Sequence, residues 1–518
     1  MKAIRYFTLI ALLSWGGLAL AQEGDTSNVQ VQYPFGEKGS DSRGFYGNDD
    51  RQDVTTVRGY EDLVGATLVK VSKSAIQGNR IYTWSLRESL SQRYGVNNFD
   101  ENVAFLDQPT AGSCTGFFIA PDIMATAGHC VNQEGSCEDY VWIVDYTNKL
   151  QHRNSQNYIE IDPNDIYECE EIMDWDYSDE TLLDYAYMRM NKKTEREPYM
   201  FRTDGDVQYW QDIFMIGAPN GLPLKLVDDA KVTSTLSHPL LFVTSLDHFP
   251  GNSGGPVFDK SGWIEAIHVR GYTATDFDNS QRSDYIYDPT CNCIKTVSFE
   301  SYYGKGSYEM RIIETNYDIL IQAIYENIEY AIEKGNLERF NKWMTYNWIL
   351  ETEYAQKEGR LELLAADSKQ WDMLEKMLEL GTSKNITDDM ERNLYYYAVL
   401  NNNTSLIETL AKNGFNLNKQ DKFGESALFY AIERQNVEAV RLLLKYGASV
   451  SVASNLYGYT PLHYAARIGN IEIAEMLINK GANIMAKSSS GWNTIKLAKK
   501  SKNKAMKKYL KRRKKQSK

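Results

Sequence analysis

The chain has 518 residues, of which 42% are hydrophobic and 24% are charged. This composition is close to that of globular proteins and argues against a wholly disordered chain, and the length allows about three domains. The charge is uneven, because 13 of the 57 Lys and Arg residues lie between 496 and 518, where there is no acid. The rest of the chain therefore holds 44 basic against 69 acidic residues. Such an acidic body is a poor nucleic-acid binder, so we expect no nucleic-acid partner.

The first 21 residues have the parts of a secretory signal peptide. Lys2 and Arg5 precede an apolar run at 6–20, and Ala19-Leu20-Ala21 supplies a small-x-small end. A membrane anchor is the alternative, but the run is shorter than the roughly 20 residues that span a bilayer. We therefore expect residues 1–21 to be cleaved and the protein to be secreted or periplasmic.

Residues 22–52 are rich in Gly, Asp, Ser and Asn and show little periodicity, so we interpret them as a propeptide or mobile lead segment. From 53 to 320, short runs of strand-forming residues alternate with turn signals, for example at 66–71, 116–119, 141–144, 213–216, 240–244 and 263–269. Many short strands predict a sandwich or a barrel. The acid-rich stretch at 162–180 lacks EF-hand spacing, and we interpret it as a solvated loop.

The cysteines point to disulfide bonds in this first half of the chain. All six lie before residue 294, at Cys114, Cys130, Cys137, Cys169, Cys291 and Cys293. An even number of cysteines in an exported chain predicts disulfides, and these spacings match no zinc pattern. We therefore predict no metal site.

A repeat of about 33 residues runs through 321–498. Alanines and glycines mark it, at Ala331, Ala365, Ala398, Ala431, Ala465 and Ala498 and at Gly381, Gly414, Gly447 and Gly481. This period is typical of ankyrin repeats, with two helices and a turn per unit. The unit Gly-Tyr-Thr-Pro-Leu-His-Tyr-Ala-Ala at 458–466 resembles that family's T-P-L-H-x-A text, and His463 occupies its usual structural position. We expect five to six units in an all-α solenoid that binds a protein partner, followed by a basic tail at 499–518.

Three separated strings carry candidate chemistry. His129 lies in Thr-Ala-Gly-His-Cys at 126–130, Asp184 in Leu-Asp-Tyr-Ala at 183–186, and Ser253 in Gly-Asn-Ser-Gly-Gly-Pro at 251–256. A serine hydroxyl is a weak nucleophile that needs an adjacent base. An imidazole can take its proton and return it, and a buried carboxylate can orient that imidazole. Asp184 is preferred over its rivals Asp176 and Asp179 because apolar residues flank it.

The three strings, in this order, resemble the trypsin-like (chymotrypsin-fold) serine peptidases over about 45–320. More narrowly they resemble the bacterial glutamyl-endopeptidase-like branch, in which Asn precedes the serine. The resemblance implies an all-β double barrel that hydrolyses peptide bonds through an acyl-enzyme, without a metal or organic cofactor. It implies a triad of His129, Asp184 and Ser253, with an oxyanion hole formed by the backbone N–H groups of Gly251 and Ser253.

The resemblance also implies a disulfide bond between Cys114 and Cys130. The four remaining cysteines allow three connectivities, which stay open.

Two features give opposite predictions for the substrate side chain. Asp247 lies six residues before Ser253, where the resemblance places a carboxylate that selects Arg or Lys. His268, in Ile-His-Val-Arg-Gly at 267–271, resembles a segment in which a histidine binds an acidic side chain. We favour cleavage next to acidic residues, and Asp247 as a mere loop acid remains an alternative.

The sequence thus predicts an exported serine endopeptidase that acts on proteins or peptides and carries an ankyrin arm for recognition or docking. The alternative is a catalytically inactive peptidase fold that serves as an ankyrin-based binding scaffold. The basic tail either contacts anionic surfaces such as lipid head groups or simply caps the last repeat.

Overall fold

The computed structural model describes residues 51–516, apart from 59, 61–62, 132–136, 151–156, 179, 236–238, 248, 271–284, 297–306 and 359–360. The predicted signal peptide, and the predicted lead segment up to residue 50, lie outside the described residues. In the part of the chain that is described, no helix is both long enough and apolar enough to span a bilayer.

Six antiparallel strands close the first barrel, in the order β10-β6-β5-β2-β7-β9. They are β2 (Thr67–Ser72), β5 (Thr115–Phe118), β6 (Ile123–Thr126), β7 (Tyr140–Val144), β9 (Ile166–Tyr177) and β10 (Asp184–Met190). Phe117, Trp142 and Tyr187 are fully buried and fill the core around these strands. The acid-rich stretch that we expected to be a loop is largely strand β9, whose Glu168, Glu170 and Glu171 are exposed.

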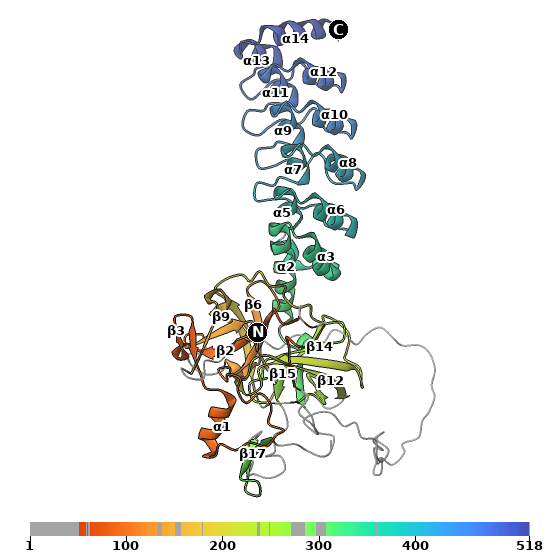
Figure 1. The fold of residues 1–518 in the computed structure, drawn as a ribbon. Coiled ribbons are helices and arrows are strands. Elements are labelled where there is room, and N and C mark those ends of the chain that lie inside the picture. The colour runs from red at the N-terminus through yellow and green to blue at the C-terminus, as the bar shows by residue number, and fades with distance from the viewer. Residues whose placement is uncertain are drawn as a thin grey trace, which may run out of the picture. The chain divides into compact units, whose positions relative to one another are not determined.

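A second six-stranded barrel follows the order β12-β11-β14-β15-β18-β13, and pairing of β12 with β13 closes it. Its strands are β11 (Asp212–Gly217), β12 (Lys225–Ser234), β13 (Leu241–Thr244), β14 (Pro256–Asp259), β15 (Ile264–Arg270) and β18 (Ser307–Arg311). A short strand, β1 (Gln52–Asp53), adds to β12 from outside. Two antiparallel barrels confirm the predicted chymotrypsin-like all-β fold (Figure 1).

Smaller elements decorate the barrels. Strands β3 (Ile76–Gln77), β4 (Arg80–Tyr82) and β8 (Tyr158–Glu160) form a three-stranded sheet, and β16 (Tyr285–Asp288) pairs with β17 (Cys293–Thr296). Helix α1 (Leu86–Tyr94) begins with a capping box between Ser85 and Glu88 and ends at Gly95 in the left-handed conformation. Both are ordinary start and stop signals of a helix.

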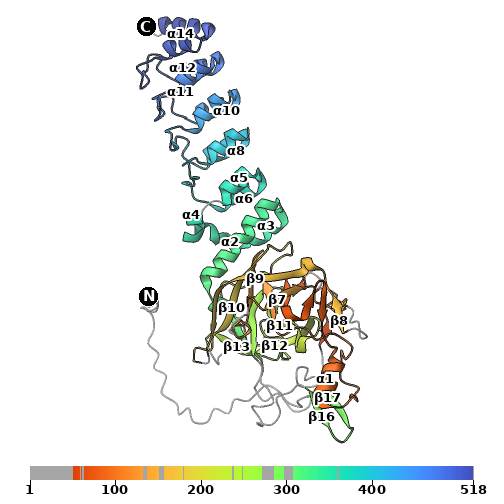
Figure 2. The same ribbon diagram turned by 90° about the vertical axis from the view of Figure 1, so that its left-hand side faces the viewer.

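The C-terminal region is helical. Its helices are α2 (Tyr317–Lys334), α3 (Leu337–Trp343), α4 (Glu353–Glu358), α5 (Leu361–Asp367), α6 (Trp371–Leu380), α7 (Leu394–Leu400), α8 (Thr404–Lys412), α9 (Ala427–Glu433), α10 (Val437–Lys445), α11 (Pro461–Ile468), α12 (Ile471–Asn479), α13 (Thr494–Lys500) and α14 (Lys504–Gln516). Helices α5, α7, α9, α11 and α13 pack one on the next, and α8, α10 and α12 form a second column (Figures 1 and 2). The predicted solenoid is therefore confirmed.

The unit at 458–490 shows why the repeat folds in this way. Pro461 stands at the first helical position of α11, where its missing N–H costs nothing. Both ring nitrogens of His463 are engaged, because Nδ1 contacts Thr460 and Nε2 lies 3.1 Å from the Trp492 carbonyl oxygen. Burial lowers the pKa of His463. This histidine is structural.

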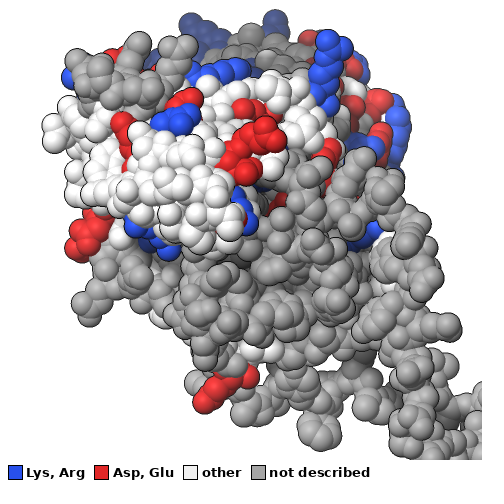
Figure 3. Space-filling model, turned by 60° about the horizontal axis from the view of Figure 1, so that its bottom comes forward, with Lys and Arg blue, Asp and Glu red and all other residues white. Residues whose placement is uncertain are grey.

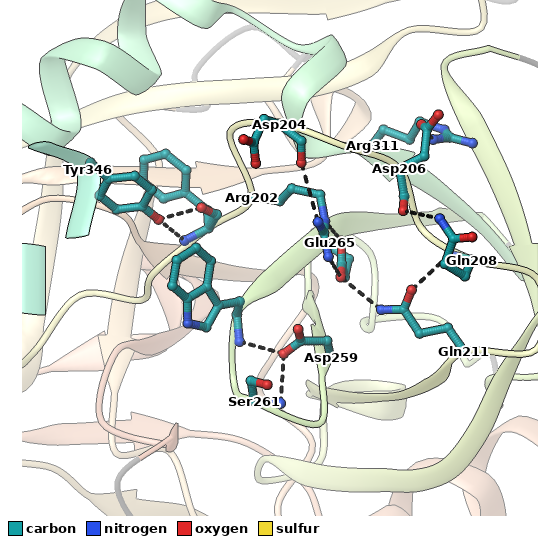
Figure 4. Close-up of polar contacts among 12 residues, drawn as sticks. Arg202, Asp204, Asp206, Gln208, Gln211, Asp259, Ser261, Glu265, Arg311 and Tyr346 are labelled. Carbon is teal, nitrogen blue, oxygen red and sulfur yellow. Dashed lines mark hydrogen bonds and ion pairs between the residues drawn. The ribbon is translucent and has the colours of Figure 1, made fainter. Parts of the chain in front are cut away.

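The first helices of the C-terminal region contact the barrels directly. Asn327 of α2 donates a hydrogen bond to the Ile119 carbonyl oxygen at 2.7 Å. The hydroxyl of Tyr346 accepts from the backbone N–H of Phe201 at 3.0 Å and donates to the carbonyl of the same residue (Figure 4). The Trp263 and Trp343 rings lie 5.6 and 5.9 Å from the Tyr346 ring. The predicted domain boundary between 320 and 321 falls inside α2.

An ion pair between Arg202 and the buried Glu265 fixes the segment whose backbone is hydrogen-bonded to Tyr346. Glu265 on β15 is 2% exposed, and its carboxylate pairs with both Nε and a terminal nitrogen of Arg202 (Figure 4). Gln211 donates a further hydrogen bond to Glu265 at 2.9 Å. A buried carboxylate is tolerated when its oxygens are engaged in this way. Arg202 is the neighbour of Phe201, so the network and the Tyr346 contact hold one segment against the second barrel.

Candidate active site

His129 and Asp184 meet because their strands are neighbours. His129 lies in a 3₁₀ turn, Gly128–Cys130, just after β6, and Asp184 begins β10, which pairs with β6. Nδ1 of His129 lies 2.8 Å from Oδ2 of Asp184, and the backbone N–H of His129 donates to Oδ1 at 3.0 Å. The Asp184 side chain is 1% exposed, whereas that of His129 is 29% exposed. A buried carboxylate thus holds both the ring and the main chain of a histidine that reaches solvent.

The turn that carries His129 requires a glycine. A Cβ on Gly128 would lie 2.1 Å from the Asp176 carbonyl oxygen, so the turn runs directly against β9. The side chain of Asp176 makes no hydrogen bond to His129 among the described residues, and the other rival, Asp179, lies outside them. Asp184 is the carboxylate that contacts the imidazole.

Ser253 lies in a loop, residues 249–255, between β13 and β14; we call it the serine loop. Two of its N–H groups are used within the loop, since Asn252 donates to Phe249 (3.1 Å) and Gly255 to Asn252 (2.8 Å). A third, that of Gly254, donates to the carbonyl oxygen of His268 on β15 at 2.7 Å.

The N–H groups of Gly251 and Ser253 donate to no acceptor among the described residues. Gly251 has φ 98°, and a Cβ there would lie 2.3 Å from the Ala218 carbonyl oxygen, so only glycine fits. Within the described part of the chain, these two donors lie close together without an acceptor, an arrangement suited to a developing oxyanion.

The main chain of Ser253 lies beside the His129 turn. Its carbonyl oxygen accepts the N–H of Thr115 at 2.8 Å, and Sγ of Cys130 lies 3.6 Å from that oxygen. No hydrogen bond between the Ser253 hydroxyl and His129 is present among the described residues. In unliganded enzymes catalytic hydrogen bonds are often long and tighten when substrate binds.

Thr115 connects the first barrel with the serine loop. Its hydroxyl is fully buried, donates to the Gly251 carbonyl at 2.7 Å and accepts the Ala218 N–H at 3.1 Å. No sequence motif singles out Thr115, because its role depends on a loop more than a hundred residues away.

The described cysteines are all paired. Cys114 and Cys130 form the disulfide that the resemblance implied, and the two remaining bonds join Cys137 to Cys169 and Cys291 to Cys293. Candidate ligand atoms of Cys114, Cys130 and His129 lie within 4.8 Å of one another. Disulfide sulfurs carry no thiolate, so this group is poorly suited to a metal ion.

The two residues predicted to contact substrate are buried, and one has a partner that sequence reasoning missed. His268 on β15 and Glu309 on β18 are cross-strand partners and are both fully buried. Nδ1 of His268 lies 3.0 Å from Oε2 of Glu309, and the Thr244 hydroxyl donates to Oε1 at 2.9 Å. Asp247, in the segment after β13, is 1% exposed. The sequence signal that could have pointed to Glu309 was the presence of an acidic residue in the short strand Ser307–Arg311.

Comparison with known proteins gives two matches. Residues 114–267 match a family model described as a trypsin-like peptidase domain. Residues 363–453 and 395–488 match one described as ankyrin repeats (3 copies). No curated protein matches the chain.

Proposed function

We propose that this chain, in which a trypsin-like peptidase domain precedes ankyrin repeats, is a serine endopeptidase with His129, Asp184 and Ser253 as its triad. The observation that carries the proposal is the double contact of the buried Asp184 carboxylate with His129. Beside it lies a loop in which two N–H groups have no acceptor among the described residues. The Asn that precedes Ser253 supports the glutamyl-endopeptidase-like branch, but the substrate preference proposed below departs from that branch.

The proposed reaction follows from these positions. The Ser253 hydroxyl attacks the scissile carbonyl while Nε2 of His129 takes its proton. Asp184 remains ionised and stabilises the imidazolium through Nδ1. The N–H groups of Gly251 and Ser253 donate to the oxyanion, each contributing about 3–4 kcal/mol of transition-state stabilisation. His129 then returns the proton to the leaving amine, and water hydrolyses the acyl-enzyme by the same route.

Hydrolysis of casein and of a peptide library tests this function. Ser253→Ala is expected to abolish turnover, while Ser261→Ala, at an exposed serine of the same barrel, retains it. Equal activity of wild type and Ser253→Ala would refute the proposed triad. Absence of turnover in correctly processed wild type would instead favour the alternative, an inactive peptidase fold that acts as a binding scaffold.

For the substrate pocket we propose His268, Asp247 and Glu309. The expectation of an acidic substrate side chain rests on the positive charge that His268 offers. Glu309 lies against that imidazole and offsets its charge, and the likeness to trypsin-like peptidases puts the buried Asp247 at the base of the substrate pocket. With Glu309 against the imidazole and Asp247 at the pocket base, the proposed pocket holds two carboxylates for one imidazole, a balance that disfavours an acidic substrate side chain. We therefore propose that a Lys or Arg side chain is preferred over Glu.

The ankyrin array is the proposed recognition or docking arm. Phe423, Leu456 and Tyr457 are 49, 67 and 52% exposed on the loops between successive units. These loops are held in register, since the Asn455 N–H donates to the Phe423 carbonyl at 2.7 Å. Exposed apolar side chains in a row are typical of protein contacts. Replacing the three by Ser is expected to slow cleavage of a protein substrate but not of a short peptide, and equal effects on both would contradict a docking role.

Export is a further part of the proposal. The disulfides in the described chain support an oxidising compartment, secreted or periplasmic. N-terminal sequencing of exported material tests it, with a start at Gln22 or later expected, and an intact Met1 contradicting it.

The basic end of the solenoid is proposed to contact anionic lipid surfaces. Its exposed cations are Lys496, Lys499, Lys500, Lys502, Lys504, Lys508, Lys511, Arg512 and Lys515. The face drawn in Figure 3 has a different charge pattern from this basic end, because Lys and Arg lie there among Asp and Glu. Met506, Tyr509 and Leu510 of α14 are buried, so this helix has no free apolar face to insert into a bilayer. Binding to anionic vesicles is therefore expected to rest on charge and to vanish at high salt, and no binding at low salt would contradict it.

A further inference from the structure

Arg51 packs against the first residue of the serine loop. Arg51 is 4% exposed, and its guanidinium carbon lies 3.8 Å from the centre of the Phe249 ring. Phe249 is itself 3% exposed, and its carbonyl oxygen accepts the N–H of Asn252. This hydrogen bond closes the turn that presents the N–H groups of Gly251 and Ser253. Arg51 thus contacts the residue from which that turn starts.

The chain next to Arg51 is locked in place. Gln52 and Asp53 form β1, which pairs with Leu226 and Lys225 of β12. The Lys225 side chain is fully buried, and its ammonium group pairs with Asp53 and donates to Gln108 at 2.5 Å.

Gln108 in turn donates to the Asp53 carboxylate at 3.1 Å, so ammonium, carboxylate and amide satisfy one another. A buried lysine is stable only with such partners. Arg51 is therefore presented to Phe249 by a fixed strand.

A second aromatic ring, that of Phe105, lies near both buried cations, Arg51 and Lys225. Phe105 lies 5.4 Å from the Arg51 guanidinium and 4.3 Å from the Lys225 ammonium. Its φ of 62° is left-handed, which is rare for a bulky residue and persists only when the surroundings hold it. The ring of Phe105 is thus held beside both cations, which supports a built arrangement around Arg51.

We propose that Arg51 is a positioning residue for the proposed peptidase: stacked on Phe249, it holds the serine loop in the conformation that presents both N–H groups to the oxyanion. This inference rests on the proposed function. Arg51 touches no reacting atom and acts through Phe249, so its loss affects the chemical step more than substrate affinity. A cation over an aromatic face, shielded from water, is a directional contact that an apolar side chain of equal length does not replace.

Arg51→Met in the full chain tests the inference, because methionine keeps the apolar bulk and removes the cation. We expect kcat to fall about tenfold or more with KM changed less than about twofold. Labelling of Ser253 by a small fluorophosphonate is expected to slow by a similar factor. Arg51→Lys, which restores a cation over the ring, is expected to recover part of both rates. Arg80→Met is the matched control, since Arg80 lies 4.5 Å from the Tyr158 ring on an exposed part of β4.

Three results would overturn the inference. One is a wild-type kcat in Arg51→Met. Another is a loss that disappears when rates are expressed per titrated active site, because Arg51 would then only stabilise the fold. A third is an equal loss in Arg51→Lys and Arg51→Met. If wild type itself fails to react at Ser253, the proposed function falls first and this inference with it.

Discussion

The carboxylate of Asp184 binds His129 twice, once at Nδ1 of the ring and once at the backbone N–H. The ring contact sets the tautomer, because a proton on Nδ1 leaves Nε2 free to accept one. The backbone contact fixes the turn from which the ring projects. One buried carboxylate therefore controls both the chemistry and the position of the imidazole.

Asp184→Asn separates these two roles. The amide oxygen can still accept the His129 N–H, but it cannot supply the negative charge that stabilises an imidazolium. We expect kcat/KM to fall by about 10³–10⁴ with the fold intact. Asp176→Asn, at the rival acid on β9, is expected to stay within about twofold of wild type. A loss below tenfold in Asp184→Asn would mean that another carboxylate orients His129.

The charge of Glu309 is expected to bias the substrate choice. Glu309→Gln removes a buried negative charge beside His268 while keeping the size of the side chain. We expect the ratio of kcat/KM for Arg-containing over Glu-containing peptides to fall about tenfold. Glu314→Gln, at an exposed glutamate just after β18, is the control. An unchanged ratio, or a clear preference of wild type for Glu, would contradict the proposed pocket charge.

Tyr346 is expected to stabilise the barrels although it lies in the helical region. Tyr346→Phe leaves the buried N–H and carbonyl groups of Phe201 without their partner, which costs about 1–3 kcal/mol. Unfolding in urea, monitored through the loss of peptidase activity, measures this cost in the free energy of unfolding. Tyr457→Phe, at a residue that is 52% exposed, is expected to have no effect. An unchanged midpoint in Tyr346→Phe would show that the barrels do not depend on this contact.

Glu362 is expected to make one ankyrin unit sensitive to pH. Burial raises its pKa from 4.5 to about 7, and its partner is the Thr382 hydroxyl. The folded state therefore binds this proton more tightly, so the contribution of Glu362 to stability is fully present below pH 4.5 and is lost, by up to about 3 kcal/mol, as the pH rises through 7.

Amide hydrogen exchange in α5 and α6 at pH 5 and 7.5, corrected for intrinsic rates, measures the effect of Glu362. Glu362→Gln is expected to abolish the pH difference in protection, and Glu375→Gln, exposed on α6, is expected to retain it. Equal pH dependence in wild type and Glu362→Gln would contradict the assignment.

The fold was predictable because its signals are local or periodic. The helical units follow from a 33-residue repeat, and the strings around His129 and Ser253 are short and contiguous. The strand β9 was missed because its acids disfavour a strand by propensity, whereas pairing with both β7 and β10 decides the outcome. Its glutamates are accommodated since they face water.

The partners of the site residues were harder to predict than the residues themselves. Glu309 reaches His268 only through the register of β15 and β18, which no local motif encodes. Arg51 belongs to a stretch that we interpreted as a lead segment, yet it is buried and the next residue begins β1. The Glu309–His268 and Arg51–Phe249 contacts both depend on the folded barrel. The sequence around these residues contains no motif that predicts either contact.

The most direct measurement is the mass of the full chain after reaction with a small fluorophosphonate, followed by peptide mapping. We expect a single adduct on Ser253 in wild type and none in His129→Ala, because the hydroxyl becomes nucleophilic only through the imidazole. An unmodified Ser253 in folded wild type, or equal labelling in His129→Ala, would contradict it.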